Sequence, residues 1–215
     1  MDKRILCFGD SNTWGAIPLS EARYPSDVRW TGVLQTLLGS GWAVIEEGYS
    51  GRTSVWDDPI EGKMSGLHYL VPCLDSQAPL DLVVLMLGTN DTKERFGCCA
   101  ETIATGMNRL IAAVRAMNSA AQPVPHVLLI SPILMSAEYV HTPLLGYFGS
   151  GCVEKTQGFA LAYEAVAAQN GCFFLDAAKA AGPSPRDGCH MEPEAHAALG
   201  MAIYEKIREI FPAAF

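Results

Sequence analysis

Long apolar runs are missing from this 215-residue sequence. No segment approaches the roughly 20 consecutive apolar residues that a membrane-spanning helix needs, so the sequence predicts no membrane partner. The apolar stretch at residues 5–8 is too short for the core of a signal peptide, and no small-residue cleavage site follows it. We therefore expect these residues to form a first strand and the protein to be cytoplasmic.

Basic residues are also scarce. Lys plus Arg number 15 and Asp plus Glu number 23, which gives a net charge of −8. Such an acidic chain is poorly suited to a nucleic-acid backbone, so we expect no nucleic-acid partner. The seven cysteines are an odd number in a chain too large to depend on disulfides. We expect them to be mostly reduced, as in the cytosol.

The sequence has no internal repeat, low-complexity tract or charge run. Its composition, 49% hydrophobic and 18% charged residues, excludes wholesale disorder. The length is sufficient for one domain with a sizeable core and short for two, so residues 1–215 are predicted to form a single domain.

Short apolar runs alternate with longer amphipathic segments along the chain. The runs favour strands at residues 4–8, 43–46, 82–87, 126–130 and 172–175, and the third run is continuously apolar, as expected for a strand covered on both faces. The amphipathic segments favour helices at residues 28–38, 101–117, 153–169 and 194–210. This alternation predicts an α/β protein with three α/β/α layers and a five-stranded parallel sheet.

Chemically useful residues follow three of the predicted strands. Gly9-Asp10-Ser11-Asn12 follows the first, Gly48-Tyr49-Ser50-Gly51 lies beyond the second, and Gly88-Thr89-Asn90-Asp91 follows the third. A fourth block, Asp187-Gly188-Cys189-His190, lies near the C-terminus. Open parallel sheets hold their ligands beyond the carboxyl ends of the strands, so these blocks are expected to meet there.

Each block alone has an ordinary interpretation. A Gly-x-Ser turn occurs in many phosphate-binding loops, Asn90 could cap a helix, and an Asp-x-x-His sequence is more often a surface turn than a catalytic pair. Together, and in this order, the four blocks form a specific set.

The set resembles the SGNH (GDSL-type) hydrolase superfamily, which is named for a Ser, a Gly, an Asn and a His in four separate blocks. The resemblance extends from Arg4 to about Gly200 and is closer still to the bacterial arylesterase/acyltransferase branch, notably at residues 4–11, 27–34, 44–48 and 85–93. It implies a flavodoxin-like α/β fold and a serine esterase. One departure is Asn12, where the GDSL name has Leu, and this residue could alter the wall beside the nucleophile.

By this resemblance Ser11 is the nucleophile, and a serine hydroxyl needs a base within hydrogen-bond reach. His190 is the candidate base because Asp187, three residues earlier, can fix its tautomer and stabilise the imidazolium. His196, which lies on a predicted helix, is the alternative base, but we interpret it as a packing or pocket-rim residue.

Three groups are candidates to stabilise the oxyanion: the backbone N–H of Ser11, the backbone N–H of Gly51 and the side-chain amide of Asn90. The arylesterase branch implies Gly51, whereas the wider superfamily leaves Gly48 as the alternative. Asn90 suits the role because its amide does not titrate.

Neighbouring residues receive supporting roles. Asp10 is expected to hold the site together by accepting hydrogen bonds from backbone N–H groups of the second and third loops, and Trp14 could line the pocket or pack. Asp91 is predicted to cap the helix that follows it. Asp57 and Asp58 have no histidine at metal-ligand spacing, so they are interpreted as a solvated turn, with no metal site. The cysteines, Cys98, Cys99 and Cys189 included, are expected to take no part in catalysis.

The substrate is less well defined by sequence. Residues 132–151 form a long connection whose single charged residue is Glu138, and such a connection usually covers a site or contacts another subunit. The resemblance implies short acyl esters, such as acetyl esters, of aryl or alkyl alcohols, acyl transfer as a further activity, and a homo-oligomer. O-acetylated carbohydrates, lysophospholipids and thioesters are the alternative substrates.

A binding module is the competing class of function. Residues 9–15 could form the phosphate loop of a flavodoxin-like nucleotide or flavin binder. However, Asp10 would then place a carboxylate against the phosphate, and the Asp187–His190 pair would have no task. We therefore favour an enzyme without a cofactor.

Overall fold

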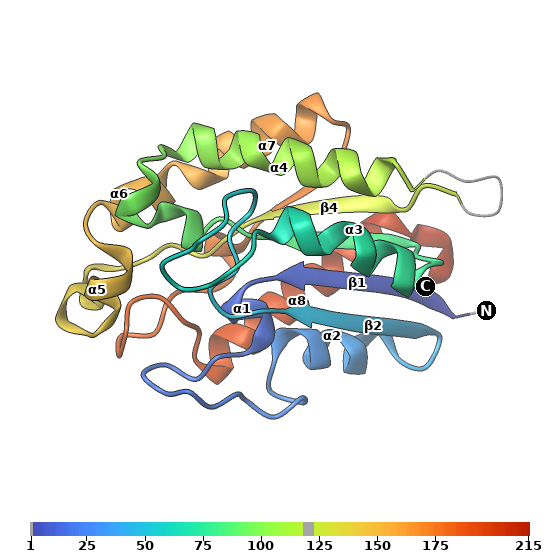
Figure 1. Ribbon diagram of the computed structural model, residues 1–215. Helices are drawn as coiled ribbons and strands as arrows, with labels where there is room; N and C mark the ends of the chain where they lie inside the picture. The colour runs from blue at the N-terminus through green and yellow to red at the C-terminus, as the bar shows by residue number, and fades with distance from the viewer. Residues whose placement is uncertain (1, 118–122) are drawn as a thin grey trace.

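The computed structural model describes residues 2–117 and 123–215. Its centre is a parallel sheet of five strands in the order β2-β1-β3-β4-β5 (Figure 1). The strands are β1 (Lys3–Gly9), β2 (Trp42–Gly48), β3 (Leu82–Met86), β4 (His126–Ser131) and β5 (Phe173–Asp176). This is the flavodoxin-like strand order. The predicted α/β fold with a five-stranded parallel sheet is therefore confirmed.

Helices cover both faces of the sheet (Figure 1). On one face, α2 (Trp30–Leu38) packs against α8 (Pro193–Ile210), and on the other lie α3 (Gly66–Gln77), α4 (Ala100–Arg115) and α7 (Phe159–Gln169). The shorter helices are α1 (Ser11–Trp14), α5 (Leu144–Phe148) and α6 (Cys152–Gln157), with 3-10 turns at Asn90–Thr92, Glu94–Phe96, Ala137–His141, Ala177–Lys179 and Pro212–Ala214. Of the helices in the described residues, none is both long and apolar enough to cross a bilayer.

Two helical predictions differ from the structure. Helix α3 was not predicted, and Pro72 lies inside it, where proline normally disfavours a helix. Residues 153–169, predicted as one helix, form α6 and α7 with a break at Gly158. A Cβ at Gly158 would lie 2.7 Å from the Cβ of Ala100 at the start of α4. The glycine therefore allows the close approach of α4 at this break.

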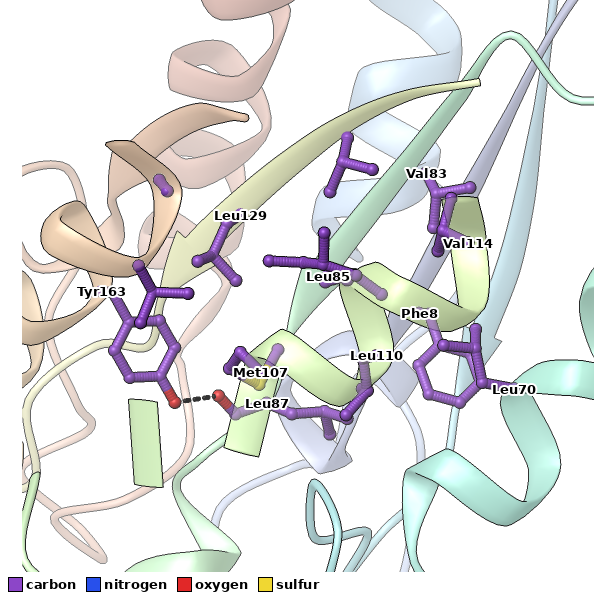
Figure 2. Packing of buried hydrophobic residues seen from close by; sticks show 14 of the residues in the cluster. Phe8, Leu70, Val83, Leu85, Leu87, Met107, Leu110, Val114, Leu129 and Tyr163 are labelled. Atoms are coloured by element: carbon purple, nitrogen blue, oxygen red, sulfur yellow. Dashed lines mark hydrogen bonds between the residues drawn. The ribbon is translucent and has the colours of Figure 1, made fainter. Parts of the chain in front are cut away.

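The core has two large apolar clusters separated by the sheet, and a third, smaller cluster of buried residues lies beside the 132–151 connection: Met135, Tyr139, Phe148, Cys152 and Cys189. Alternate residues of β3 belong to opposite clusters: Val83 and Leu85 pack beneath α4 and α7, whereas Val84 packs beneath α2 and α8. This alternation follows from the two-residue period of a strand. Figure 2 shows the first cluster, where the Tyr163 hydroxyl donates a 2.7 Å hydrogen bond to the carbonyl of Leu87, the residue that follows the central strand β3.

The strand order determines where the candidate site lies. Strand β1 lies between β2 and β3, so the loops that follow these three strands are neighbours at the carboxyl edge of the sheet. In Figure 1 this is the edge that carries α1 and α5, opposite the chain termini.

Candidate active site

Ser11, His190 and Asp187 form a continuous chain of contacts. Ser11 begins α1, directly after β1, and its Oγ lies 3.1 Å from His190 Nε2. His190 Nδ1 lies 2.6 Å from Asp187 Oδ2. With Nδ1–H donating to the carboxylate, Nε2 is free to accept the serine proton, which is the arrangement required of a general base.

The Asp187 carboxylate is built into its loop. Its Oδ1 accepts hydrogen bonds from the backbone N–H groups of Cys189 (3.0 Å) and His190 (2.9 Å). Burial tends to raise the pKa of Asp187, but the hydrogen bonds and charge of His190, together with these amides, outweigh it and lower the pKa. The carboxylate is therefore ionised at neutral pH and able to stabilise an imidazolium.

The turn that presents Ser11 is capped at both ends. Asp10 accepts a 3.0 Å hydrogen bond from the backbone N–H of Asn12, and Gly15 ends α1 with a φ of 89°, in the left-handed region that favours glycine. Among the described residues, no backbone N–H of the second or third loop donates to Asp10, so the predicted bonds to these groups were wrong; the third loop acts on Asp10 only through the side chain of Thr89, which lowers its pKa. Burial raises the pKa of Asp10 to about 6, although its hydrogen bond to Asn12 and the charges of His190 and Arg52 act against this shift.

The proposed oxyanion donors face the same pocket. Ser11, Gly51 and Asn90 all line it. Within the described residues, no group accepts a hydrogen bond from the backbone N–H of Ser11 or Gly51. The side-chain amide of Asn90 donates 3.2 Å to the carbonyl of Arg52, which orients this amide and leaves its second hydrogen for a ligand.

The two candidate glycines have different surroundings. Gly51 has a φ of 81° and lines the pocket. Gly48 ends β2, and a Cβ there would lie 2.1 Å from the backbone nitrogen of Trp14, so Gly48 lets β2 pack directly against α1. The geometry thus favours Gly51 as the donor and gives Gly48 a packing role.

Asn12 was expected only to alter a wall, but it joins two loops. Its Nδ2 donates 3.2 Å to the carbonyl of Cys189, and its Oδ1 accepts 3.2 Å from the backbone N–H of Met191. The residue after Ser11 therefore holds both chain neighbours of His190. The sequence signal was the departure from the GDSL pattern at position 12.

Asp91 also differs from its prediction. Instead of capping the following helix, its buried carboxylate accepts 2.9 and 3.1 Å hydrogen bonds from the backbone N–H of Ser54. This contact ties the loop after β3 to the loop after β2. Burial raises the pKa of Asp91 to about 6, against the lowering effect of the Ser54 bonds.

The pocket above Ser11 has a volume of about 460 Å³. Trp14 lines it, and the 132–151 connection contributes Leu144, Tyr147 and Phe148. Polar side chains complete the wall: Ser20, Glu21, Tyr49, Ser50, Glu61 and Lys93. Residues 132–151 thus cover the site, which is one of the two roles predicted for them.

Sequence reasoning missed an ion cluster at this wall. Asp58 was interpreted as part of a solvated turn, but its side chain is fully buried between Lys93 and Arg95. Glu61 joins the same two cations. These residues come from separate loops, and no spacing in the sequence indicates their pairing.

The other histidines and the cysteines contribute no second centre. His196 is buried in α8, where its Nδ1 accepts a 3.4 Å hydrogen bond from the backbone N–H of Trp30, and burial lowers its pKa to about 4. Cys189 is buried, and burial raises the pKa of its thiol well above the usual value. In residues 2–117 and 123–215, no group of three or more His, Cys, Asp or Glu side chains could hold a metal ion.

Comparison with known proteins identifies the family. The chain matches the GDSL-like lipase/acylhydrolase family over residues 7–198. The native aryl esterase of M. smegmatis is 40% identical with a TM-score of 0.91, and the match covers 96% of this chain and 99% of that one. A carbohydrate acetylesterase from Sinorhizobium meliloti is 38% identical with a TM-score of 0.90, and the match covers 98% and 100%. No curated protein matches the chain.

The family match spans more than half of the chain, and its position includes Ser11, Gly51, Asn90 and His190. The chain therefore belongs to the GDSL-like lipase/acylhydrolase (SGNH) family and is a carboxylic-ester hydrolase.

Proposed function

We propose that the protein hydrolyses short-chain acyl esters through an acyl-enzyme on Ser11. The observation that carries this proposal is the contact chain from Asp187 through His190 to Ser11, which ends in a pocket lined by Gly51 and Asn90. A nucleophile, a base, an orienting carboxylate and oxyanion donors are the groups that acyl transfer requires.

The reaction proceeds in two symmetrical halves. Ser11 Oγ attacks the acyl carbon while its proton passes to His190 Nε2, and the resulting oxyanion accepts hydrogen bonds from the backbone N–H groups of Ser11 and Gly51 and from the Asn90 amide. Collapse of this intermediate expels the alcohol, which takes the proton from His190. Water then attacks the acyl-enzyme with His190 as base, and the acid leaves Ser11.

A small acyl group and a medium-sized alcohol suit the pocket. Its volume of about 460 Å³ and the side chains of Trp14, Leu144 and Phe148 favour an aryl or alkyl alcohol. The M. smegmatis relative, an aryl esterase, supports this substrate class. An alcohol that replaces water in the second half-reaction would give acyl transfer.

Acetylated carbohydrate is the second candidate substrate. Ser20, Glu21 and Glu61 offer hydrogen-bonding groups at the pocket wall, and the relative from Sinorhizobium meliloti is a carbohydrate acetylesterase. A panel of aryl acetates, longer p-nitrophenyl esters and acetylated sugars separates the candidates. A higher kcat/KM for the acetylated sugars would favour the second.

We further propose a homo-oligomer assembled through the 132–151 connection. Leu134, Val140, Leu145 and Tyr147 expose between 38% and 53% of their surface there. Several exposed apolar side chains in one segment are typical of a segment that contacts another protein. Light scattering at several concentrations tests this, and a monomer at all of them would contradict it.

The Ser11→Ala variant tests the chemistry. It removes the nucleophile, so hydrolysis of p-nitrophenyl acetate should be abolished while the circular dichroism spectrum is unchanged. Ser76→Ala, on the outer side of α3, is the matched control and should keep full activity. A Ser11→Ala variant with a tenth of the wild-type activity would refute the proposed mechanism.

A further inference from the structure

Four charged side chains meet at one wall of the pocket. Lys93 Nζ lies 2.6 Å from Glu61 Oε1 and 3.2 Å from Asp58 Oδ2, and its side chain is only 1% exposed. Arg95 Nη2 lies 2.7 Å from Asp58 Oδ2 and also contacts Glu61 Oε1. The cluster holds two cations and two carboxylates, so its net charge is zero.

The cluster adjoins the proposed oxyanion donors. Glu61 and Lys93 both line the pocket that contains Ser11. A Cβ built on Gly51 would lie 3.2 Å from Glu61 Oε2, which places this carboxylate oxygen against the Gly51 loop. Lys93 shares a turn with Asn90, since its backbone N–H donates 3.4 Å to the Asn90 carbonyl. The charges of Glu61 and Lys93 therefore act where negative charge develops during ester hydrolysis.

The buried Asp58 carboxylate requires the cations. Burial tends to raise the pKa of Asp58, but the hydrogen bonds and charges of Arg95 and Lys93 outweigh it and lower the pKa, so the group is ionised. A buried charge that loses its partner is strongly unfavourable and is poorly screened by solvent. Without Lys93, the cluster would carry a net charge of −1 beside the oxyanion donors.

We propose that Lys93 is a positioning residue for the esterase reaction: it cancels the carboxylate charge beside Gly51 and Asn90, so that the pocket can accept the negative charge of the tetrahedral intermediate. This inference rests on the proposed serine mechanism. Lys93 suits the role because its ammonium is a compact point charge that two carboxylates can share. Arg95 holds the same carboxylates from the more exposed side.

Charge-balanced variants test this role. Lys93→Met keeps the apolar stem of the side chain but removes its ammonium and leaves one uncompensated carboxylate, so kcat for p-nitrophenyl acetate should fall at least about tenfold with little change in KM. Adding Glu61→Gln restores a net charge of zero, and most of the lost kcat should return. Lys93→Arg keeps the charge and should retain most of the wild-type kcat.

A transition-state analogue provides a readout that separates charge from packing. An alkyl boronic acid forms a tetrahedral anion on a catalytic serine, whereas the alcohol product is neutral. Lys93→Met should weaken inhibition by the boronic acid by the same factor as it lowers kcat, and inhibition by the alcohol should not change. Equal weakening of both inhibitors would indicate a general loss of pocket structure and overturn the proposal.

Other outcomes are also decisive. If Lys93→Met keeps the wild-type kcat, or if the double variant is folded and as slow as Lys93→Met, the proposal is wrong. If Lys93→Met does not fold, the charge-neutral double variant is used in its place. A folded double variant whose kcat is more than about thirtyfold below that of the wild type would overturn the proposal. Failure of the serine mechanism itself is distinguishable, because Ser11→Ala would then remain active.

Discussion

The two hydrogen bonds that join Asn12 to the loop of His190 give the sharpest test of how the site is held together. Its amide donates to the carbonyl of Cys189 and accepts from the backbone N–H of Met191, and the residue is only 3% exposed. These two bonds flank His190 on both sides. Asn12→Leu replaces the amide by an apolar group of similar size, so the side-chain volume is largely kept while both bonds are lost.

The expected cost follows from the two backbone groups left behind. A buried polar group without a partner costs about 1–3 kcal/mol, so the pair should lower the free energy of unfolding by about 2–6 kcal/mol. This is a large part of the roughly 5–15 kcal/mol that stabilises an ordinary domain. Since the 3.1 Å contact between Ser11 and His190 depends on the same loop, kcat should also fall, by about 100-fold if the histidine moves by about 1 Å.

Urea unfolding followed by tryptophan fluorescence measures the first effect, and p-nitrophenyl acetate hydrolysis measures the second. Asn108→Leu on α4 is the matched control, because it removes a side-chain bond to Asn170 that is only partly buried. The control should lose less than about 1 kcal/mol. An Asn12→Leu variant with the stability and kcat of the wild type would show that the two loops are held by other contacts.

Three further predictions concern single groups. Because burial raises the pKa of Asp10 to about 6, the folded protein binds its proton more tightly, and this residue should lower the free energy of unfolding by about 2 kcal/mol as pH rises from 4 to 6. A wild-type minus Asp10→Asn difference in urea unfolding that is flat with pH would contradict this. Gly51→Ala places a Cβ 3.2 Å from Glu61 Oε2 at a φ of 81°. The kcat should therefore fall at least about tenfold while the circular dichroism spectrum is unchanged. An unaffected kcat would argue against Gly51 as an oxyanion donor. Tyr163→Phe leaves the buried Leu87 carbonyl without the donor shown in Figure 2, so the free energy of unfolding in urea should fall by about 1–3 kcal/mol. An unchanged free energy of unfolding would mean that this carbonyl finds another donor.

The sheet could be predicted from sequence because its signals are local. A continuously apolar run such as residues 82–87 indicates a strand buried on both faces, and the structure has β3 at Leu82–Met86. The carboxyl ends of parallel strands share one edge, so the blocks that contain Ser11, Gly51 and Asn90 had to be neighbours. The Asp187–His190 pair could be predicted because both partners lie in one short turn.

The remaining features depend on contacts between distant residues. Asn12 and Cys189 are 177 positions apart, and Asp58 and Lys93 are 35 apart. No periodicity encodes such pairs, because they exist only after the loops meet. Helix α3 was missed for another reason: Pro72 is unfavourable by itself, but Leu70 and Leu74 are buried against the sheet, and packing of this face outweighs the local preference.

The buried charges at the carboxyl edge of the sheet serve catalysis at a cost in stability. Asp91 is fully buried, and burial raises its pKa to about 6, while the nearby Arg52 has its pKa lowered by burial. Each shift away from the charged form means that the folded state holds an ion less favourably than water does. The two apolar clusters on either side of the sheet supply the stability that offsets this cost. Replacements that stabilise the protein should therefore be found among these buried ions rather than in the core, and they should lower activity because the same ions align the loops around Ser11.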